Sequence, residues 1–459
     1  MHPSNIPSFP SFLAPEYLAA SEETQTVLDV WNDLKDRTSF YLPQEYKEPS
    51  QAYRNRLNRC QFDNRFEPAI KGLAGLLSCF NFNEDVAASI INASENIDNL
   101  GNNLHTFLRE ADQTAIRDGW CGVLVDFPPD DFTIQSQADF LQSQRRPYLI
   151  LIDRRDILNW RHNYIDGAPI LTQVTIRERR ITPEGEFGSK EEIFYRVLTP
   201  GLYRVFQIVE SKNREFSLVM VEEGETSLNL IPLVYYSVSK SGLFSAKPPL
   251  INLAKLNIEH FQKRSQLNEV LRKCNLPVPV RKGLIKNLSD LKNAPPLVIG
   301  PNNALDIPPD GDFYFAEPSG VAVASTEANI EKLKAAMDRL SLAFLTGGES
   351  EKTATEVLLN AAQTSASLKG MAEQKQSNTQ RIFEYWTAYT GEQNGGTINL
   401  DESILQAPIS PEATNRLTEL AQTGFISHET LLLQLKLGKI LSRDFDVQRE
   451  LSLTGNNQP

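Results

Sequence analysis

The sequence of 459 residues is poor in the patterns that mark metal and disulfide sites. Its four cysteines are far apart and form no C-x-x-C pair, which argues against a zinc site and against a disulfide framework. Its five histidines show no H-x-x-x-H spacing, so no metal site is predicted. We expect the cysteines to be buried, reduced thiols of a cytoplasmic protein. The residues concerned are Cys60, Cys79, Cys121, Cys274, His2, His105, His162, His260 and His428.

Long hydrophobic runs are absent too. The longest, such as YLILI at 148–152, have the length of a strand, whereas a membrane span needs about 20 apolar residues. The N-terminal stretch MHPSNIPSFPSFLAPEY has no basic segment and no long apolar core, so it is not a signal peptide. Residues 1–15 are rich in proline and serine, and we expect a flexible arm or one draped on a neighbouring molecule. No membrane partner is predicted.

Positive charge is in deficit, with a net charge of −12 at pH 7. This balance argues against a protein that coats nucleic acid, although local basic patches remain possible. Catalytic motifs are missing as well, because there is no G-x-S-x-G and no Cys/His nucleophile pair. Asp153, Asp156 and Asp166 could form a two-metal nuclease site. Arginines at positions 154, 155 and 161 offer them ordinary ion-pair partners, so we reject the nuclease interpretation.

The stretch TGGESEKTATEVLL at 346–359 superficially resembles a phosphate-binding loop. Such a loop requires G-x-x-x-x-G-K-[ST], because its glycines let backbone N–H groups surround the phosphates. Here Glu351 and Thr346 occupy the two glycine positions, and Glu349 and Glu356 would repel a polyphosphate. A helical pattern precedes the stretch instead of a buried strand. The sequence therefore predicts a polar, glycine-rich connection between two helices, and no cofactor.

Hydrophobic periodicity divides the chain into helical and strand-rich parts, so the predicted fold class is α+β. Strand patterns occupy 119–127, 147–153, 169–179, 191–198, 201–210, 215–223 and 231–239. Turn signals separate them at Asp166-Gly167, Pro183-Glu184-Gly185, Pro200-Gly201 and Glu223-Gly224. The predicted parts are an arm (1–15), a helical region (16–118, its first helix starting at a Ser21-x-x-Thr24 signal), a β-rich region (119–240), a long helix (248–275), a small proline-rich β unit (276–320), a helix (321–345), a loop (346–353), a long helix (354–392) and a terminal helical part (393–459).

This order of parts resembles the portal proteins of tailed bacteriophages, the head-to-tail connector ring at one vertex of the head. The resemblance covers nearly the whole chain and is closest to a portal branch long catalogued as a domain of unknown function. The stretches that carry it are GWCGVLVDFPP (119–129), RPYLILIDRRDILNWR (146–161), LTQVTIRE (171–178), PPLINLAKLNIEH (248–260), ESEKTATEV (349–357) and LAQTGFISHETLLLQLKLGKILSRDFD (420–446).

The resemblance implies a portal fold with a wing (16–247), a stem helix (248–275), a β clip (276–320), a second stem helix (321–345), a tunnel loop, a long wing helix (354–392) and a crown within 393–459. It implies a homo-dodecameric ring in the virion, assembled in the host cytoplasm, that conducts double-stranded DNA during packaging and ejection. The implied partners are the terminase large subunit, a head-tail adaptor, and the major capsid and scaffold proteins. No enzymatic activity is implied.

The alternatives that the sequence leaves open are an enzyme of phage DNA metabolism and another virion ring protein, such as an adaptor. ATP or metal binding by the isolated chain would favour the enzyme. Adaptors are generally smaller and lack two stem helices around a β clip, which counts against the second alternative.

The resemblance assigns the polar loop to the DNA channel. Its residues are Thr346, Gly347, Gly348, Glu349, Ser350, Glu351, Lys352 and Thr353. Its glycines would give mobility and its mixed charge a weak, sequence-independent contact with passing DNA. The competing interpretation is an exposed connector without any DNA role.

Two further sets of residues are candidates for binding. The first stem helix carries five basic residues that could contact phosphates, or could instead form ion pairs within the ring or a solvated face: Lys255, Lys263, Arg264, Arg272 and Lys273. The clip is too small to bury its own apolar residues, so a neighbouring subunit is expected to complete its core through Val278, Val280, Leu284, Leu297, Ile299, Tyr314 and Phe315. This need for a neighbour predicts an oligomer independently of the resemblance.

Overall fold

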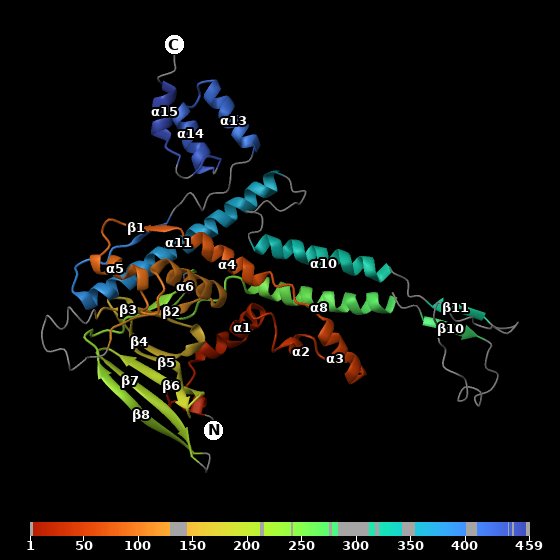
Figure 1. Ribbon diagram of the computed structural model, residues 1–459, viewed down its shortest axis with the longest axis horizontal. Coiled ribbons are helices and arrows are strands. Elements are labelled where there is room, and N and C mark those ends of the chain that lie inside the picture. Colours follow the sequence, from red (N-terminus) through yellow and green to blue (C-terminus); the bar gives the residue numbers. More distant parts are fainter. Residues whose placement is uncertain are drawn as a thin grey trace. The chain divides into compact units, whose positions relative to one another are not determined.

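The computed structural model describes residues 3–128, 145–211, 215–239, 242–274, 278–282, 312–316, 321–341, 354–400, 411–438, 440–442 and 445–455 (Figure 1). The chain forms two compact units. The first comprises Met1–Asn32, Asn64–Lys255 and Asp338–Pro459, and the second comprises Asp33–Asp63 and Leu256–Met337. The predicted α+β class is confirmed, because long helices and antiparallel sheets occur in one chain.

Helices dominate the N-terminal part of the first unit. Its elements are η1 (Pro3–Asn5), α1 (Pro15–Trp31), α4 (Phe66–Leu77), α5 (Ala88–Ala93), η2 (Ser94–Asn96) and α6 (Leu104–Asp118). Helix α6 begins where the Asn103 side chain accepts a hydrogen bond from the Thr106 N–H at 2.8 Å. It ends, as predicted, at Gly119, whose φ of 93° favours glycine. Its apolar face packs against α4 and α1.

The predicted start of the first helix at Ser21 is wrong. Helix α1 begins six residues earlier, at Pro15, which suits the first helical position because its missing N–H would have no partner there. The Ser21 hydroxyl donates to the Leu18 carbonyl at 2.7 Å and so lies inside the helix. A polar residue within a helix can thus imitate a cap in the sequence.

Two antiparallel sheets follow. The three-stranded sheet has the order β3-β2-β9 and the five-stranded sheet the order β4-β5-β6-β7-β8. Their strands are β2 (Cys121–Asp126), β3 (Tyr148–Ile152), β4 (Ile157–Ile165), β5 (Ala168–Glu184), β6 (Gly188–Thr199), β7 (Leu202–Glu210), β8 (Phe216–Glu225) and β9 (Leu233–Tyr236), with η3 (Arg154–Asp156) before β4. The two sheets share one hydrophobic core, in which Trp120, Val174 and Phe244 are buried.

Three of the predicted turns are confirmed, and one is wrong. Gly185 has a φ of 69° at the β5–β6 turn. Asp166 and Gly167 have φ values of 50° and 79° at the β4–β5 turn, and Gly201 has a φ of 78° between β6 and β7. Gly224, however, lies inside β8, where it pairs with Tyr203. A Cβ on Gly224 would lie 2.5 Å from the Tyr203 ring, so this glycine permits a close approach instead of a turn.

The pairing also reveals strands that the sequence did not predict. Strand β4 is largely polar and exposed toward its end, and it gains its backbone partners from β5. Strands β1 (Phe80–Phe82) and β12 (Ile398–Leu400) pair in antiparallel register although they are far apart in the chain. Such strands depend on a distant partner, which a local pattern does not reveal.

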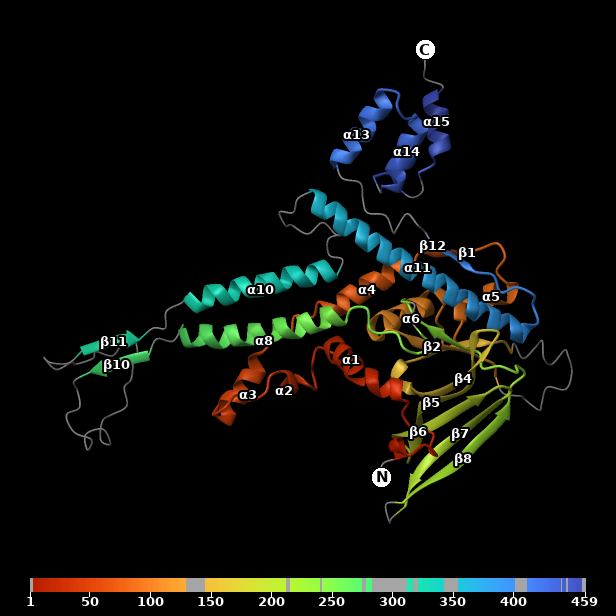
Figure 2. The same cartoon turned by 180° about the vertical axis from the view of Figure 1, so that it is seen from behind.

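Helix α11 (Ala354–Thr390) is the longest helix in the described ranges, and its C-terminal part packs into the first unit. Ile382, Phe383 and Trp386 are buried on it, and Gly391 ends it, as predicted, with a φ of 77°. Figure 2, from behind, shows its C-terminal part lying over the helices and strands of this unit. Contacts with α4, α5, β2 and β9 hold that part in place.

A fully buried ion pair lies under α11. The Lys375 ammonium is 2.6 Å from the Asp112 carboxylate on α6, and neither side chain is exposed to solvent. Lys375 also donates to the Leu77 carbonyl at 2.9 Å, and the Tyr236 hydroxyl donates to Asp112 at 2.7 Å. The pair therefore connects α11, α6, the end of α4 and β9 within one polar cluster.

The second unit contains α2 (Thr38–Tyr41), α3 (Ser50–Arg59), most of α8 (Ile251–Cys274), β10 (Val278–Lys282), β11 (Asp312–Ala316) and most of α10 (Val321–Leu340). Strands β10 and β11 form an antiparallel pair between α8 and α10 in the chain. The long helix and the strands predicted at 277–284 and 312–318 are thus observed, whereas the extended pieces predicted at 295–300 and 304–309 lie outside the described residues.

Three short helices end the described chain: α13 (Pro411–Gln422), α14 (His428–Leu437) and α15 (Val447–Gly455). The predicted cap of α14 is confirmed, because Ser427 accepts from the Thr430 N–H at 3.1 Å. Asp446 likewise accepts from the N–H groups of Gln448 and Arg449, both at 3.0 Å. Within the described ranges, no helix is both long and apolar enough to cross a membrane.

Replacing Lys375 by methionine should unfold the first unit more easily. The substitution leaves the Asp112 carboxylate buried without its counter-ion, which typically costs about 3–5 kcal/mol. Urea unfolding followed by tryptophan fluorescence measures the change, since Trp120 and Trp386 are buried in this unit.

The matched control for this substitution is Lys369→Met, six residues earlier on α11, where the lysine is exposed. It should leave the unfolding midpoint nearly unchanged. Adding Asp112→Asn to Lys375→Met should restore part of the loss, because asparagine keeps an acceptor for Tyr236 without a charge. Equal effects of the two lysine substitutions would contradict the role of the buried pair.

Candidate functional site

The loop predicted to face a DNA channel, Thr346–Thr353, lies outside the described residues. The described chain stops at residue 341 and resumes at Ala354, where α11 begins. The loop therefore connects α10 to α11, as the sequence predicted, and its contact with DNA stays a prediction.

The five basic candidates of the first stem helix lie on α8 and differ in their surroundings. Lys255 and Arg272 are exposed and Lys263 is half-buried, and none of the three has an ion-pair partner among the described residues. Arg264 lies 3.9 Å from the Asp63 carboxylate. Lys273 is in the helix, but its side chain lies outside the described part. Arg264 thus has a partner within its own chain, whereas Lys255, Lys263 and Arg272 have no ion-pair partner in the described ranges, and contact of any of them with phosphate stays a prediction.

The segment before α4 covers the buried face of α8 within the second unit. Arg59 pairs with Glu269 at 2.7 Å, and the Asn257 side chain donates to the Asp63 carbonyl at 2.8 Å. Phe62 meets Phe261 edge-on, with ring centroids 5.6 Å apart. These contacts fix which side of α8 faces its own chain. Lys255, at the end of the α8 segment that belongs to the first unit, is exposed.

The clip candidates are only partly described. Val280 pairs with Tyr314 and Pro279 with Phe315 in the β10–β11 register, and Val278 pairs with Ala316. Tyr314 is 48% exposed. Leu284, Leu297 and Ile299 lie outside the described residues. Completion of the clip core by a second subunit stays a prediction.

The carboxylates of the alternative nuclease site do not converge. Asp153 pairs with Arg155 at 2.5 Å and with Arg117 at 2.9 Å, and Asp156 pairs with Arg177 at 2.8 Å. Asp166 lies at the β4–β5 turn. Burial would raise the pKa of Asp153, but its arginine partners hold it below the ordinary value. Among the described residues, no group of three His, Cys, Asp or Glu side chains could hold a metal ion.

Sequence reasoning missed a pocket between the N-terminal arm and the outer face of the five-stranded sheet. We predicted an arm over 1–15 that is flexible or draped on a neighbouring molecule, whereas Pro10, Phe12 and Ala14 are hydrogen-bonded to β4 of their own chain. Asn159 donates to the carbonyls of Pro10 and Phe12 at 3.1 and 2.7 Å, and the Ala14 N–H donates to the Leu158 carbonyl at 2.9 Å. Asn159 also accepts from Thr175 at 2.8 Å, which orients its amide.

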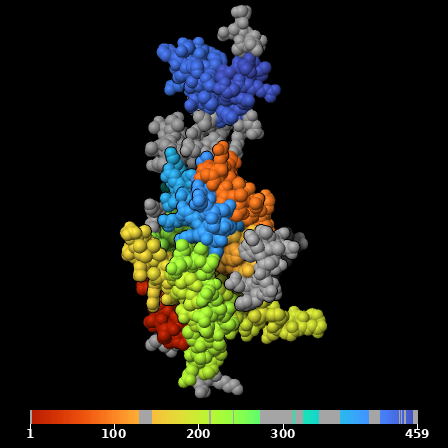
Figure 3. Space-filling view, turned by 90° about the vertical axis from the view of Figure 1, so that its left-hand side faces the viewer, coloured from red at the N-terminus to blue at the C-terminus, as the bar shows by residue number. Residues whose placement is uncertain are grey.

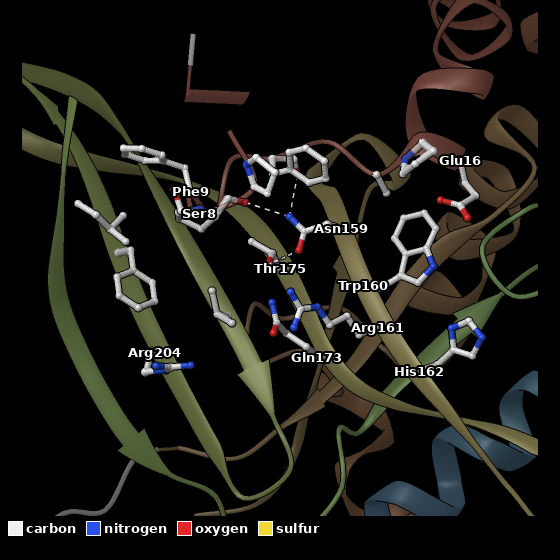
Figure 4. A pocket seen from close by; sticks show the side chains of 18 residues that line it. Ser8, Phe9, Glu16, Asn159, Trp160, Arg161, His162, Gln173, Thr175 and Arg204 are labelled. Atoms are coloured by element: carbon white, nitrogen blue, oxygen red, sulfur yellow. Dashed lines mark hydrogen bonds between the residues drawn. The ribbon is translucent and has the colours of Figure 1, made fainter. Parts of the chain in front are cut away.

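The pocket, here called the arm–sheet pocket, has a volume of about 470 Å³. Aromatic and basic side chains line it together, including Phe9, Trp160, Arg161, Arg204 and Phe206. Figure 4 shows Arg161 and Gln173 in the middle of the pocket and Glu16 at one end, above Trp160. Neither arginine has an ion-pair partner in the described chain. This lining suits an aromatic group that carries negative charge beside it.

Comparisons with known proteins give one domain match and a set of similar structures. Residues 249–390, from just before α8 to the end of α11, match a family described as "Domain of unknown function (DUF4055)". A comparison with curated proteins found no match.

Three similar structures each cover 80% of this chain and 88% of their own. One belongs to "Neck of empty GTA particle computed with C6 symmetry", with 9% identity and a TM-score of 0.40. The others belong to "Virion of native gene transfer agent (GTA) particle" and "Neck of native GTA particle computed with C12 symmetry", each with 11% identity and a TM-score of 0.39.

Replacing Asn159 by alanine should loosen the arm. Two hydrogen bonds to arm carbonyls and one to Thr175 would be lost. Amide hydrogen exchange at residues 9–14 should become faster, roughly fivefold or more, since each lost bond contributes about 1 kcal/mol.

Asn163→Ala is the matched control, because Asn163 is exposed on the same strand and holds no arm residue. It should leave exchange in the arm unchanged. Unaltered exchange in Asn159→Ala would mean that other contacts hold the arm.

Proposed function

We propose that the chain is a portal protein: a subunit of a ring at one head vertex that conducts double-stranded DNA during packaging and ejection. The supporting observation is the succession α8, β10–β11, α10, connecting loop and α11. Two helices that flank a small β pair, followed by a loop and a 37-residue helix, correspond to stem, clip, stem, tunnel loop and wing helix. The matched family domain spans this succession.

Each part of the proposed portal subunit has its own role. The β10–β11 pair is the docking site for the terminase large subunit during packaging and later for the head-tail adaptor. Residues 16–247 and α11 form the wing, against major capsid and scaffold proteins, and α13–α15 form the crown. The loop Thr346–Thr353 and the free lysines of α8 face the DNA. The role requires no catalytic group in this chain, since the terminase supplies the ATPase chemistry.

Weak contact is the appropriate chemistry for a conduit. Phosphate contacts by lysine are independent of sequence and weaken steeply with salt, so DNA can slide along them. The overall negative charge of the chain works against tight wrapping of DNA. A few free lysines on a helix that is otherwise paired within its chain would guide the duplex without holding it.

The purified chain should assemble into rings with an open central channel and about twelvefold symmetry, seen by cryo-electron microscopy. A ring arises because the clip and the exposed apolar residues need a neighbour. A monodisperse monomer or dimer, at high concentration and with scaffold protein added, would exclude the portal function. Binding of ATP or a metal by that monomer would then favour an enzyme.

Replacing both Lys255 and Lys263 by glutamine should weaken the binding of a short DNA duplex to the assembled ring a few-fold at low salt. The dependence of binding on salt concentration should also become shallower, because fewer counterions are released. Fluorescence anisotropy of labelled DNA across a salt series measures both effects.

Lys71→Gln serves as the control for the DNA measurement, since Lys71 is an exposed lysine of α4 that pairs with Glu67 at 2.6 Å. It should not alter DNA binding. If the α8 substitutions behave like this control while rings form normally, α8 does not contact the phosphates.

A further inference from the structure

The tip of the β5–β6 hairpin is an exposed aromatic residue between carboxylates. Phe187 is 94% exposed, and Ile181 below it is 77% exposed. Glu184 and Glu186 flank the turn, which Gly185 allows with a φ of 69°. Neither glutamate has a cationic partner in the described chain. Figure 3 shows yellow segments, which belong to β4–β6, standing out from the surface of the first unit.

Leaving the apolar side chain of Phe187 exposed to water is unfavourable in free energy. Burying an aromatic side chain removes roughly 150–250 Å² from solvent, and aromatic residues dominate the energetics of interfaces. The tip gains nothing from its own fold, because Phe187 touches almost no other side chain. It therefore has the properties of an anchor for another molecule.

The arm–sheet pocket has the complementary chemistry. Its aromatic side chains Phe9 and Phe206 suit a phenyl ring, and Arg161 and Arg204 suit flanking carboxylates. The guanidinium of Arg204 already lies over the Phe206 ring, 5.7 Å from its centroid. A volume of about 470 Å³ leaves room for a phenylalanine side chain together with a neighbouring glutamate. The one carboxylate in the lining, Glu16, lies at an end of the pocket (Figure 4).

The tip cannot enter the pocket of its own chain. Thr175 lines the pocket and Glu184 ends the same strand β5, nine residues further along. An extended strand rises about 3.3 Å per residue, so the two lie roughly 30 Å apart. Strand β5 pairs with β6 over this whole length, which prevents it from folding back.

We propose that the β5–β6 tip of one copy docks in the arm–sheet pocket of the next copy. Phe187 enters between the arm and the sheet, and Glu184 and Glu186 pair with Arg161 and Arg204. Because the tip and the pocket are different surfaces of one subunit, the contact is heterologous and joins copies head to tail. The contact between tip and pocket is inferred from the two surfaces alone. The further step, that head-to-tail copies close into a ring, rests on the proposed portal function.

Photocrosslinking in the full-length protein tests the contact. Benzoylphenylalanine replaces Phe187, the assembled protein is irradiated, and mass spectrometry locates the crosslinks. We expect covalent multimers in which position 187 is joined to the peptides that contain Asn159–His162 or Arg204–Phe206. The same probe at Tyr46, an aromatic residue that is 90% exposed, is the control and should not label these peptides.

Charge reversal supplies a second readout. Glu184→Arg with Glu186→Arg should weaken self-association at least tenfold, and so should Arg161→Glu with Arg204→Glu, in sedimentation at moderate salt. An equimolar mixture of the two variants should associate again, because the reversed tip of one variant meets the reversed pocket of the other and the second contact is wild type on both sides, so the two variants can alternate along the series. The quadruple variant, which carries all four reversals on one chain, should recover association. A direct structural effect of the substitutions would not be repaired in this way.

The outcomes separate the two proposals. Crosslinks to the pocket within rings support both, and crosslinks to the pocket within open chains support the contact and exclude the portal ring. Rings in which position 187 labels another surface, or none, overturn the contact and leave the portal function standing. A wild-type chain that neither assembles nor crosslinks overturns both.

Discussion

The buried pair of Lys375 and Asp112 is the constraint on which the first unit depends. Two charges in an apolar interior are tolerated only when both are paired and hydrogen-bonded, and here the Leu77 carbonyl and the Tyr236 hydroxyl complete the cluster. The four contributing residues come from distant parts of the chain, so the cluster forms only when α4, α6, β9 and α11 have met. It fixes α11 in position and register, because a shift of one residue would remove Lys375 from its partner.

The loop that the proposed function places against DNA is attached to the N-terminus of α11, the helix that this cluster fixes. Lys375 lies 21 residues after the start of α11, or about 32 Å along the axis.

The charged residues of the structure fall into two groups, those paired within their own unit and those at the tip and the arm–sheet pocket. Asp153, Asp156 and Glu269 all have arginine partners in their own unit, and these pairs fix strands and helices locally. Within the ranges that the structure describes, Arg161, Arg204, Glu184 and Glu186 have no ion-pair partner, although many opposite charges are present there. Exposed ion pairs contribute little to stability, so their absence costs the monomer little. The same groups gain much more when a partner removes them from water beside an aromatic ring. Free charges next to exposed aromatic residues are therefore the surfaces at which an assembly is expected to form.

Local signals in the sequence predicted the elements well, because helix ends and hairpin turns are local. Gly119, Gly391 and Ser427 end or begin helices as expected from backbone conformation and capping. The turn predicted at Gly224 is wrong because a glycine can mark either a turn or a close contact between neighbouring residues, and here it permits the close contact with Tyr203. The buried pair left a signal that could have been read: Asp112 and Lys375 both occupy positions on the apolar faces of their helices. The arm–sheet pocket left none, since it requires residues near 10 and 160 to meet. The loop and much of the clip, on which the proposed function depends, lie outside the described residues.

Head-to-tail contact through the wing and weak contact with DNA place different demands on one chain, and the structure separates them. The tip belongs to the five-stranded sheet and the pocket lies between this sheet and the arm, whereas the unpaired basic residues lie on α8, with Lys255 in the first unit and Lys263 and Arg272 in the second. In the proposed portal, subunit association must be strong enough to keep a ring closed while DNA passes, and the proposed aromatic anchoring in a pocket would supply strength that salt does not abolish. Phosphate contact must be weak, and solvated lysines supply it in a form that salt screens. If both proposals hold, raising the salt concentration should release DNA before it opens the ring, because the two contacts rest on different physical interactions.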